Sequence, residues 1–281
     1  MRRGLLIAVA VIVAGCSPRT APPPPSKPAY TIGQPYQQGS VWRYPAERFG
    51  GTETGLATRQ TGARIAADGE AWDDTQPLAS HPTLQLPAVV RATNLDTGTT
   101  LAIRVIDRGP PDAGRVIGLS GRAAALLGLG SQPIPVRVEV DSVRSQVIRD
   151  SLQPAGTGLI AAPRASVTQE TLPGAPGGLR QFVPTQEAIP SAAPPLPTEA
   201  EPGLPSPGQI WLRAGTFGQI GFARLQATRL AAIVPRVEQA GTGRAATYTV
   251  RAGPYASAAA ADTALDQAVA AGVTDARIVV E

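Results

Sequence analysis

The chain has 281 residues, enough for about two domains, and its 30 glycines and 29 prolines point to linkers rather than to one compact unit. Its net charge of +4 is small, and its arginines are dispersed without interleaved aromatic residues, which argues against a nucleic-acid partner. One histidine and one cysteine exclude a disulfide framework and a standard zinc cluster, so no metal or cofactor is expected.

The first sixteen residues have the features of an export signal. Arg2 and Arg3 precede an apolar run, residues 5–14, that is too short to span a bilayer but has the length of a signal sequence. The ending Val-Ala-Gly-Cys16 resembles a bacterial lipoprotein signal. This resemblance implies removal of residues 1–15, lipidation of Cys16 and, because Ser17 follows, a lipid anchor on the periplasmic face of the outer membrane. The alternative is an ordinary signal peptide with an incidental cysteine.

A proline-rich tether, residues 16–28, leads into a region with the composition of a folded domain, residues 29–145. Strand patterns recur in it, and residues 96–99 predict a hairpin turn. The predicted strands are residues 88–95, 99–107 and 134–143. Residues 120–129 predict a short helix, with Ser120 as its N-cap and a glycine as its stop. Short strands with one helix predict a small, mostly β barrel.

Residues 146–207 are rich in proline and poor in apolar clusters, which predicts a disordered linker. Order returns in residues 208–281, where the segment Arg-Ala-Gly-x-aromatic occurs twice, at Arg213 and at Arg251. Each copy follows a strand-like stretch and precedes an amphipathic helix. The apolar faces of these helices are Ala223, Ala227, Leu230, Ala231 and Val234, and Ala261, Ala264, Leu265, Ala268 and Val269. Two such units predict an α+β, ferredoxin-like domain with helices on one face of its sheet.

The first folded region resembles the double-psi β-barrel of the rare lipoprotein A family of septal lytic transglycosylases. The segments that carry the resemblance are ADGEAWD, SHPTLQLP, VRATNLDTGTTLAIRVIDRGP and RVIGLSGRAAALLG. The second region resembles a SPOR domain through WLRAGTF and YTVRAGPY. Signal, barrel, linker and SPOR domain follow one another in the order typical of that family.

The resemblance implies that the substrate is peptidoglycan, above all glycan strands stripped of stem peptides at the division septum. It implies non-hydrolytic cleavage of the MurNAc–GlcNAc β-1,4 bond, in which the muramic 6-hydroxyl attacks its own C1 and leaves a 1,6-anhydro end. Septal proteins are further expected partners.

The resemblance also indicates site residues. Glu70 matches the catalytic acid, which would protonate the leaving oxygen and then deprotonate the 6-hydroxyl, a role that needs a raised pKa. Asp107 matches the second acid and His81 a further catalytic position. The candidate substrate-binding residues are Asp73, Arg108, Arg213, Arg251 and Tyr248. Without the resemblance, Glu70 would be an exposed loop acid, Asp107 a turn former and His81 a brace of the barrel.

The chain also departs from the family pattern. The Ser-Trp-Tyr-Gly segment that usually precedes the Gly-Glu motif is missing, and Gly118 stands where the family usually has an aspartate. These losses remove an aromatic pair and an acid from the surroundings of Glu70. Two functions therefore stay open: a lytic transglycosylase, or a catalytically inactive, outer-membrane-anchored glycan binder that scaffolds septal factors.

Overall fold

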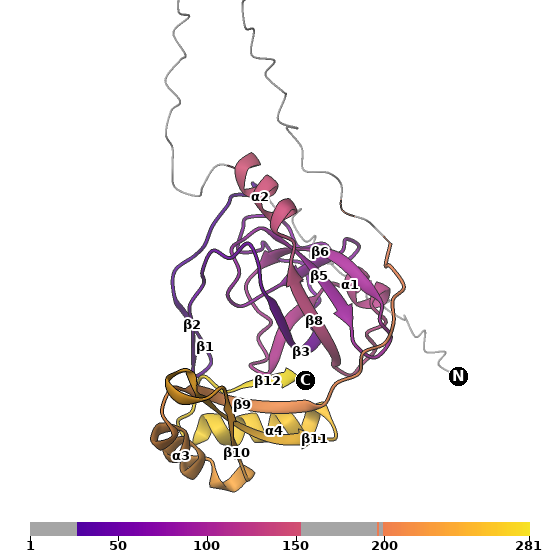
Figure 1. Ribbon diagram of the computed structural model, residues 1–281. Helices are drawn as coiled ribbons and strands as arrows, with labels where there is room; N and C mark the ends of the chain where they lie inside the picture. Colours follow the sequence, from indigo (N-terminus) through magenta and orange to yellow (C-terminus); the bar gives the residue numbers. More distant parts are fainter. Residues whose placement is uncertain (1–26, 153–195, 197–198) are drawn as a thin grey trace, which may run out of the picture.

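The structure is a computed structural model that describes residues 27–152, 196 and 199–281 (Figure 1). The expected signal peptide, Cys16, most of the tether and most of the linker lie outside these residues. Two domains are visible, one in indigo to magenta and the other in orange to yellow (Figure 1).

The first domain is a closed barrel of six strands in the order β3-β7-β4-β6-β5-β8. The pairs β3–β7 and β4–β6 are parallel, and the other neighbours are antiparallel. The strands are β3 (Thr52–Arg59), β4 (Leu78–Ser80), β5 (Ala88–Asn94), β6 (Thr100–Asp107), β7 (Arg115–Leu119) and β8 (Ile134–Val140). Three of them are the strands predicted above, so the predicted barrel is confirmed. A hairpin, β1 (Tyr36–Gln38) and β2 (Val41–Arg43), precedes it.

Aliphatic side chains fill the barrel, and β6 shows how the sequence pattern produces this core. Leu101, Ile103 and Val105 point inward, while Ala102 and Arg104 between them are half-buried on the other face. The alternation stops at the end of the strand, where Ile106 and Asp107 are both buried. A second layer must therefore cover the outer face at this end of β6.

Two helices complete this domain. Helix α1 (Gly121–Leu126) begins at the predicted N-cap, where the buried Oγ of Ser120 accepts a hydrogen bond from the Ala123 N–H at 3.3 Å. Helix α2 (Ser142–Ser151) extends beyond residue 145, the expected end of the domain. The Oγ of Ser145 holds α2 to β5, since it lies 2.9 Å from the Val89 nitrogen and 3.1 Å from the Val89 oxygen.

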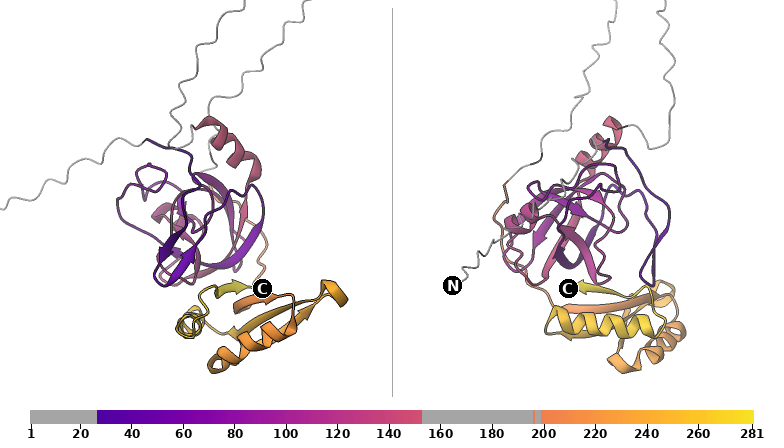
Figure 2. Two further views of the ribbon diagram at one scale, coloured as in Figure 1. Left: turned by 90° about the vertical axis from the view of Figure 1, so that its left-hand side faces the viewer. Right: turned by 180° about the vertical axis from the view of Figure 1, so that it is seen from behind.

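The second domain is a four-stranded antiparallel sheet in the order β10-β11-β9-β12. Its elements are β9 (Ile210–Phe217), α3 (Ile220–Arg229), the 3-10 turn η1 (Ala231–Ile233), β10 (Arg236–Ala240), the 3-10 turn η2 (Gly243–Ala245), β11 (Thr247–Tyr255), α4 (Ala258–Ala270) and β12 (Arg277–Val280). Both helices pack into one apolar cluster with the sheet, which confirms the predicted α+β domain (Figure 2).

One of the two predicted helix faces is partly wrong. Helix α4 buries Ala261, Ala264, Leu265 and Ala268 as expected. Helix α3, however, ends at Arg229, and the chain then turns through η1, which leaves Ala231 exposed and Val234 77% exposed. Val234 adopts a left-handed conformation (φ 51°), so the helical periodicity cannot continue to it.

The two domains contact each other along strands β3 and β12 (Figures 1 and 2). The Arg115 guanidinium forms two hydrogen bonds with the Asp262 carboxylate, at 2.6 and 2.8 Å. Leu56 of the barrel joins the apolar cluster of the second domain. Gly114 lies so close to Ile278 that an added Cβ would be 2.8 Å from its Cδ1 atom. None of the helices in the described parts of the chain has the length and apolar character needed to cross a membrane.

Candidate active site

A loop that connects β3 to β4 covers the outer face at the end of β6 and carries Glu70. Its two halves pair with each other, because the Trp72 N–H donates to the Arg64 oxygen (2.8 Å) and the Ala66 N–H to the Glu70 oxygen (2.7 Å). Between them Gly69 adopts φ +93°, a conformation that favours glycine. Trp72 is buried with Ala66, Leu78 and Ile106, so this aromatic residue anchors the loop in a small apolar cluster.

Glu70 is held at the barrel surface with most of its side chain covered. Its carboxylate forms a short ion pair with Arg104 of β6. Burial raises the pKa of Glu70, and the positive charge of Arg104 acts in the opposite direction. A cavity of about 430 Å³ opens beside this pair, and Arg144 and Ile148 of α2 line its other side. The predicted acid therefore has both a raised pKa and space for a ligand.

Asp107 lies beneath the same loop and is fixed by three donors. Its Oδ2 accepts from the Arg64 Nε at 2.7 Å, and its Oδ1 from the backbone N–H groups of Ala67 (3.0 Å) and Arg108 (2.8 Å). The Arg64 guanidinium in turn stacks on the Trp72 ring, 3.9 Å from its centroid. These contacts connect Asp107 to the loop that carries Glu70 and hold its carboxylate in one orientation.

A third carboxyl group, Asp68, belongs to this cluster, and sequence reasoning missed it. Asp68 is 3% exposed; its Oδ1 accepts from the Glu70 N–H at 2.9 Å, and its Oδ2 is buried without a hydrogen-bond partner among the described residues. Burial raises its pKa to about 7, and the charges of Glu70 and Asp107 add to this effect. The Asp-Gly-Glu sequence of a tight turn was the signal that could have revealed it.

The three acids do not form a metal centre. In the described ranges no group of three His, Cys, Asp or Glu side chains is arranged to hold a metal ion. Arg64 and Arg104 instead face Asp107 and Glu70. The arrangement can hold one carboxyl group protonated close to ionised ones, which is the requirement for acid and base chemistry.

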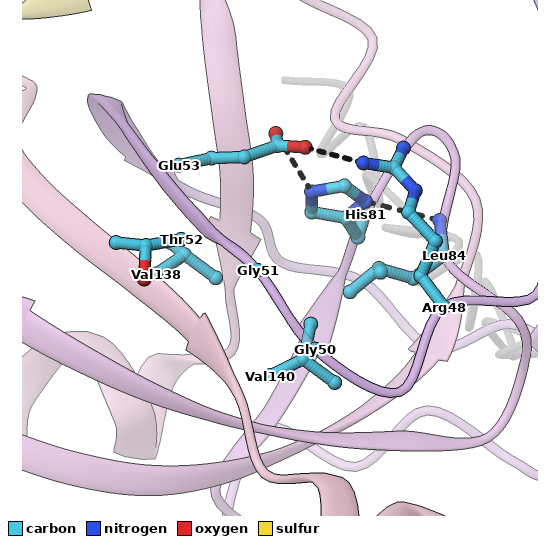
Figure 3. Close-up of a pocket in the computed structure, with 9 residues that line it drawn as sticks. All are labelled: Arg48, Gly50, Gly51, Thr52, Glu53, His81, Leu84, Val138 and Val140. Carbon is cyan, nitrogen blue, oxygen red and sulfur yellow. Dashed lines mark hydrogen bonds and ion pairs between the residues drawn. The ribbon is translucent and has the colours of Figure 1, made fainter.

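His81, predicted as a catalytic residue, directs its side chain at Glu53 and not at Glu70 or Asp107. Its backbone N–H donates to the Asp107 oxygen (3.0 Å), but its side chain is fully buried and its Nε2 faces Glu53 at 3.6 Å (Figure 3). Its Nδ1 accepts from the N–H groups of Thr83 and Leu84, both at 3.2 Å. Burial lowers the pKa of His81, so the ring is neutral at pH 7 with its proton on Nε2.

Glu53, the partner of His81, is a second acid that sequence reasoning did not select. The His81 ring and the Arg48 guanidinium lower the pKa of Glu53 to about 2. These three side chains line a cavity of about 80 Å³ (Figure 3). His81 therefore pairs with Glu53, and its side chain makes no hydrogen bond to Glu70 or Asp107 in the described structure.

The space at Gly118 is filled by another polar group. A Cβ added at Gly118 would lie 2.5 Å from both the Gln60 Oε1 and the Ser80 Oγ. These two atoms are hydrogen bonded to each other. Ser80 pairs in register with Asp107 on one side and with Gly118 on the other. The Gln60 carboxamide thus occupies the place of the side chain that Gly118 lacks.

The other predicted binding residues lie in several places. Asp73 is a turn residue whose Oδ1 accepts from the Thr75 N–H (2.8 Å) and hydroxyl (2.7 Å). Arg108 donates to the backbone oxygens of Leu84 and Ile32 and so connects three segments. In these positions both side chains stabilise loops around the site.

In the second domain the two repeats are paired strands, and Arg213 lies directly opposite Arg251. Both guanidinium groups contact the Glu281 carboxylate, and Arg251 also stacks on Trp211 at 4.1 Å. Tyr248 packs against the apolar core instead. It therefore does not share the helix-free face with the two arginines.

Comparison with known proteins agrees with this architecture. A lytic transglycolase family model matches residues 53–138, and a SPOR domain model matches residues 206–278. The endolytic peptidoglycan transglycosylase RlpA of Pseudomonas aeruginosa is 31% identical over 244 residues, which cover 83% of this chain and 70% of that protein. RlpA of Escherichia coli is 34% identical over 137 residues, covering 47% of this chain and 36% of that protein.

A crystal structure of the SPOR domain of RlpA from Pseudomonas aeruginosa overlaps 25% of this chain and 96% of that domain, at 20% identity and a TM-score of 0.23. The family assignment rests on the sequence matches, which extend through both domains. With a barrel that matches the lytic transglycolase model and a SPOR domain after it, the chain belongs to the RlpA family.

Proposed function

We propose that this protein is an endolytic peptidoglycan transglycosylase that cleaves MurNAc–GlcNAc β-1,4 bonds and leaves 1,6-anhydroMurNAc ends. The observation that carries the proposal is a group of three carboxyl side chains in a chain of the RlpA family: Asp68 and Glu70 on the β3–β4 loop of the barrel, and Asp107 beneath that loop. Glu70 combines a raised pKa with an adjacent cavity of about 430 Å³.

The reaction needs one group that first gives and then takes a proton. Protonated Glu70 donates its proton to the bridging O4 as the C1–O4 bond breaks. The 6-hydroxyl of the same muramic residue attacks C1, and its proton passes to the Glu70 carboxylate as the C1–O6 bond forms. Glu70 thus ends the cycle protonated, and no water is consumed.

Asp107 and Asp68 support these steps. The fixed negative charge of Asp107 favours the positive charge that develops on the sugar ring in the transition state. Asp68, with a pKa of about 7, stays largely protonated below neutral pH and so limits the repulsion between the three acids. His81 acts indirectly, because it fixes the turn that follows β4.

The test is product analysis with the full chain in detergent. We expect amidase-stripped sacculi to release 1,6-anhydromuramyl fragments, identified by mass spectrometry, and Glu70→Gln to abolish them while sacculus binding persists. Hydrolytic products with a reducing MurNAc end, or unchanged release by Glu70→Gln, would contradict the mechanism.

One observation favours a second candidate function, a non-catalytic glycan binder that scaffolds septal factors. The ion pair between Glu70 and Arg104 opposes the protonation that an acid catalyst needs. For this candidate, the same assay would show binding to sacculi without any anhydro product from the unmodified chain.

Features near both ends of the chain support a proposal for its location. We place the protein in the periplasm at the division septum, lipid-anchored to the outer membrane through Cys16, with the SPOR domain on denuded glycan. The VAGC sequence supports the anchor, and the SPOR family match supports the septal site. Cys16→Ser should abolish palmitate labelling and release the protein from outer-membrane fractions; retention of both would contradict the anchor.

A further inference from the structure

A row of arginines crosses the sheet of the second domain on its helix-free face. Arg236 of β10, Arg251 of β11, Arg213 of β9 and Arg277 of β12 lie side by side, because each is the register partner of the next. Adjacent strands are about 4.8 Å apart, so the row is roughly 14 Å long. Within the described residues two carboxylates pair with it, Glu238 and Glu281.

The row continues into a groove between the two domains. This groove has a volume of about 380 Å³, and Arg213 and Arg277 form part of its wall. The barrel side contributes Arg43, Arg48 and Arg115. Glu53 is the one acidic residue among the described lining residues. Arg48, Arg115 and Arg213 form ion pairs with Glu53, Asp262 and Glu281. Among the described residues, Arg43 of the barrel and Arg277 of the second domain therefore supply the positive charge that no ion pair offsets.

Contacts within the barrel and one ion pair between the domains position these arginines. The Arg43 Nε donates to the Gln38 Oε1 at 3.0 Å, and this hydrogen bond within the β1–β2 hairpin holds the Arg43 side chain at the groove. The pairs Arg48–Glu53 and Arg115–Asp262 fix the guanidinium groups of two further lining residues. Because these side chains are held before a ligand arrives, less conformational entropy is lost on binding.

We propose that this groove is a binding site shared by the two domains for a carboxylate-bearing glycan strand. Guanidinium groups pair with carboxylates through two parallel hydrogen bonds, and an arginine row suits a polymer that presents carboxylates repeatedly. The identity of the glycan rests on the proposed function: a denuded strand exposes the lactyl carboxylates of muramic acid. The strand would run from the sheet of the second domain across Arg277 to Arg43 of the barrel.

The proposal is tested by binding of the full chain in detergent to amidase-stripped sacculi. We expect Arg43→Ala, a change in the barrel, to weaken binding at least threefold although the SPOR sheet is intact, and Arg277→Ala to do the same. The matched control is Arg224→Ala on the exposed side of α3, which should bind like the unmodified chain. If Arg43→Ala binds as well as this control, the shared site does not exist.

A second background tests whether the site needs both domains together. Asp262→Arg places two cations face to face at the domain contact and should separate the domains. In that background Arg43→Ala should have no further effect on binding. An effect of the same size as before would mean that the barrel binds the strand alone, which overturns the shared site.

Two modified substrates identify the chemistry. Chemical reduction of the sacculus carboxyl groups should remove the effect of Arg43→Ala; a persisting effect would overturn carboxylate recognition. Intact sacculi, which carry stem-peptide carboxylates, should bind less tightly than stripped ones, and equal binding would overturn the assignment to lactyl groups. If the protein releases anhydro products but Arg43→Ala does not weaken its binding to sacculi, the groove is refuted and the transglycosylase is not. If Arg43→Ala weakens binding but the unmodified protein releases no anhydro products, the transglycosylase is refuted and the groove is not.

Discussion

At the scale of single residues, Arg104 is expected to set the pH range in which Glu70 can act as an acid. Its charge lowers a pKa that burial raises, so Arg104→Met should shift the pKa of Glu70 further upward. A general acid works only while protonated, so the alkaline limit of product formation should move to higher pH. The measurement is the rate of anhydro-product release against pH, with the exposed Arg91→Met on β5 as control. A shift to lower pH would contradict the role of Glu70.

Asp68 should make the stability of the fold depend on pH. Its pKa is 3.8 in the unfolded chain and about 7 in the folded protein. Its contribution to stability is therefore complete below about pH 4 and is lost as the pH rises through 7, by at most about 4 kcal/mol. Urea unfolding at pH 4, 5.5 and 7 should show that Asp68→Asn loses less stability than the unmodified protein over this range. Parallel curves for the two proteins would refute the buried acid.

Two substitutions of His81 distinguish a structural role of this residue from a catalytic one. His81→Ala leaves the N–H groups of Thr83 and Leu84 without their acceptor and opens a cavity, which should cost about 3 kcal/mol. His81→Asn retains an acceptor oxygen near the Nδ1 position, so it should recover part of the stability and keep most of the activity. Both are measured by thermal unfolding and product release. An Asn variant that is stable but inactive would show that the ring touches the substrate.

Sequence alone could indicate Glu70 and Asp107 as acids but not their partners. Arg104, on the solvent side of β6, pairs with Glu70, and Arg64 of the loop pairs with Asp107. The path of the loop determines both pairs. A pattern of residue types does not contain that path. The same reason explains why Asp68 was missed and why the side chain of His81 was expected at the site rather than against Glu53.

At the scale of elements, Ser120 connects helix α1 to the strand and loop that flank the site. Its Oγ accepts from the N–H groups of Ala123 (3.3 Å) and Leu78 (3.1 Å) and donates to the Gln76 oxygen (2.6 Å). Ser120→Ala should therefore lower the free energy of unfolding by about 2 kcal/mol, which is more than the loss of an ordinary exposed N-cap side chain costs. Urea unfolding measures this, with Ser151→Ala at the exposed end of α2 as control. Equal stability of the two variants would refute the connection.

Periodicity predicted β5, β6 and β8 of the barrel and the repeated strands and helices of the second domain, because one face of each is buried. It did not predict β3 or β7, and most of α2 fell in the expected linker. It gave no signal for β4, which has three residues that are all buried and therefore do not alternate. It also extended the first helix of the second domain to Val234, because apolar residues of the following turn continued the pattern. Strand pairing, which places Ser80 between Asp107 and Gly118, was beyond any local pattern.

At the scale of the whole molecule, the contact between the domains was not predictable from sequence. The long segment between them suggested two units that move independently. The residues that join them, Leu56, Arg115 and Asp262, are unremarkable within their own segments. Arg115 and Asp262 become partners only because β3 and β12 lie side by side.

This contact should keep the full chain compact in solution, and Asp262 is the residue that tests it. Asp262→Arg replaces a bidentate ion pair with two facing cations, one of them almost fully covered. We expect the radius of gyration from small-angle X-ray scattering to increase, while the thermal unfolding of each domain changes little. Asp266→Arg, on an exposed position of the same helix, makes the same change of charge and should leave the radius unchanged. If the two variants scatter alike, Arg115 and Asp262 do not hold the domains together, and the glycan groove between them has no fixed walls.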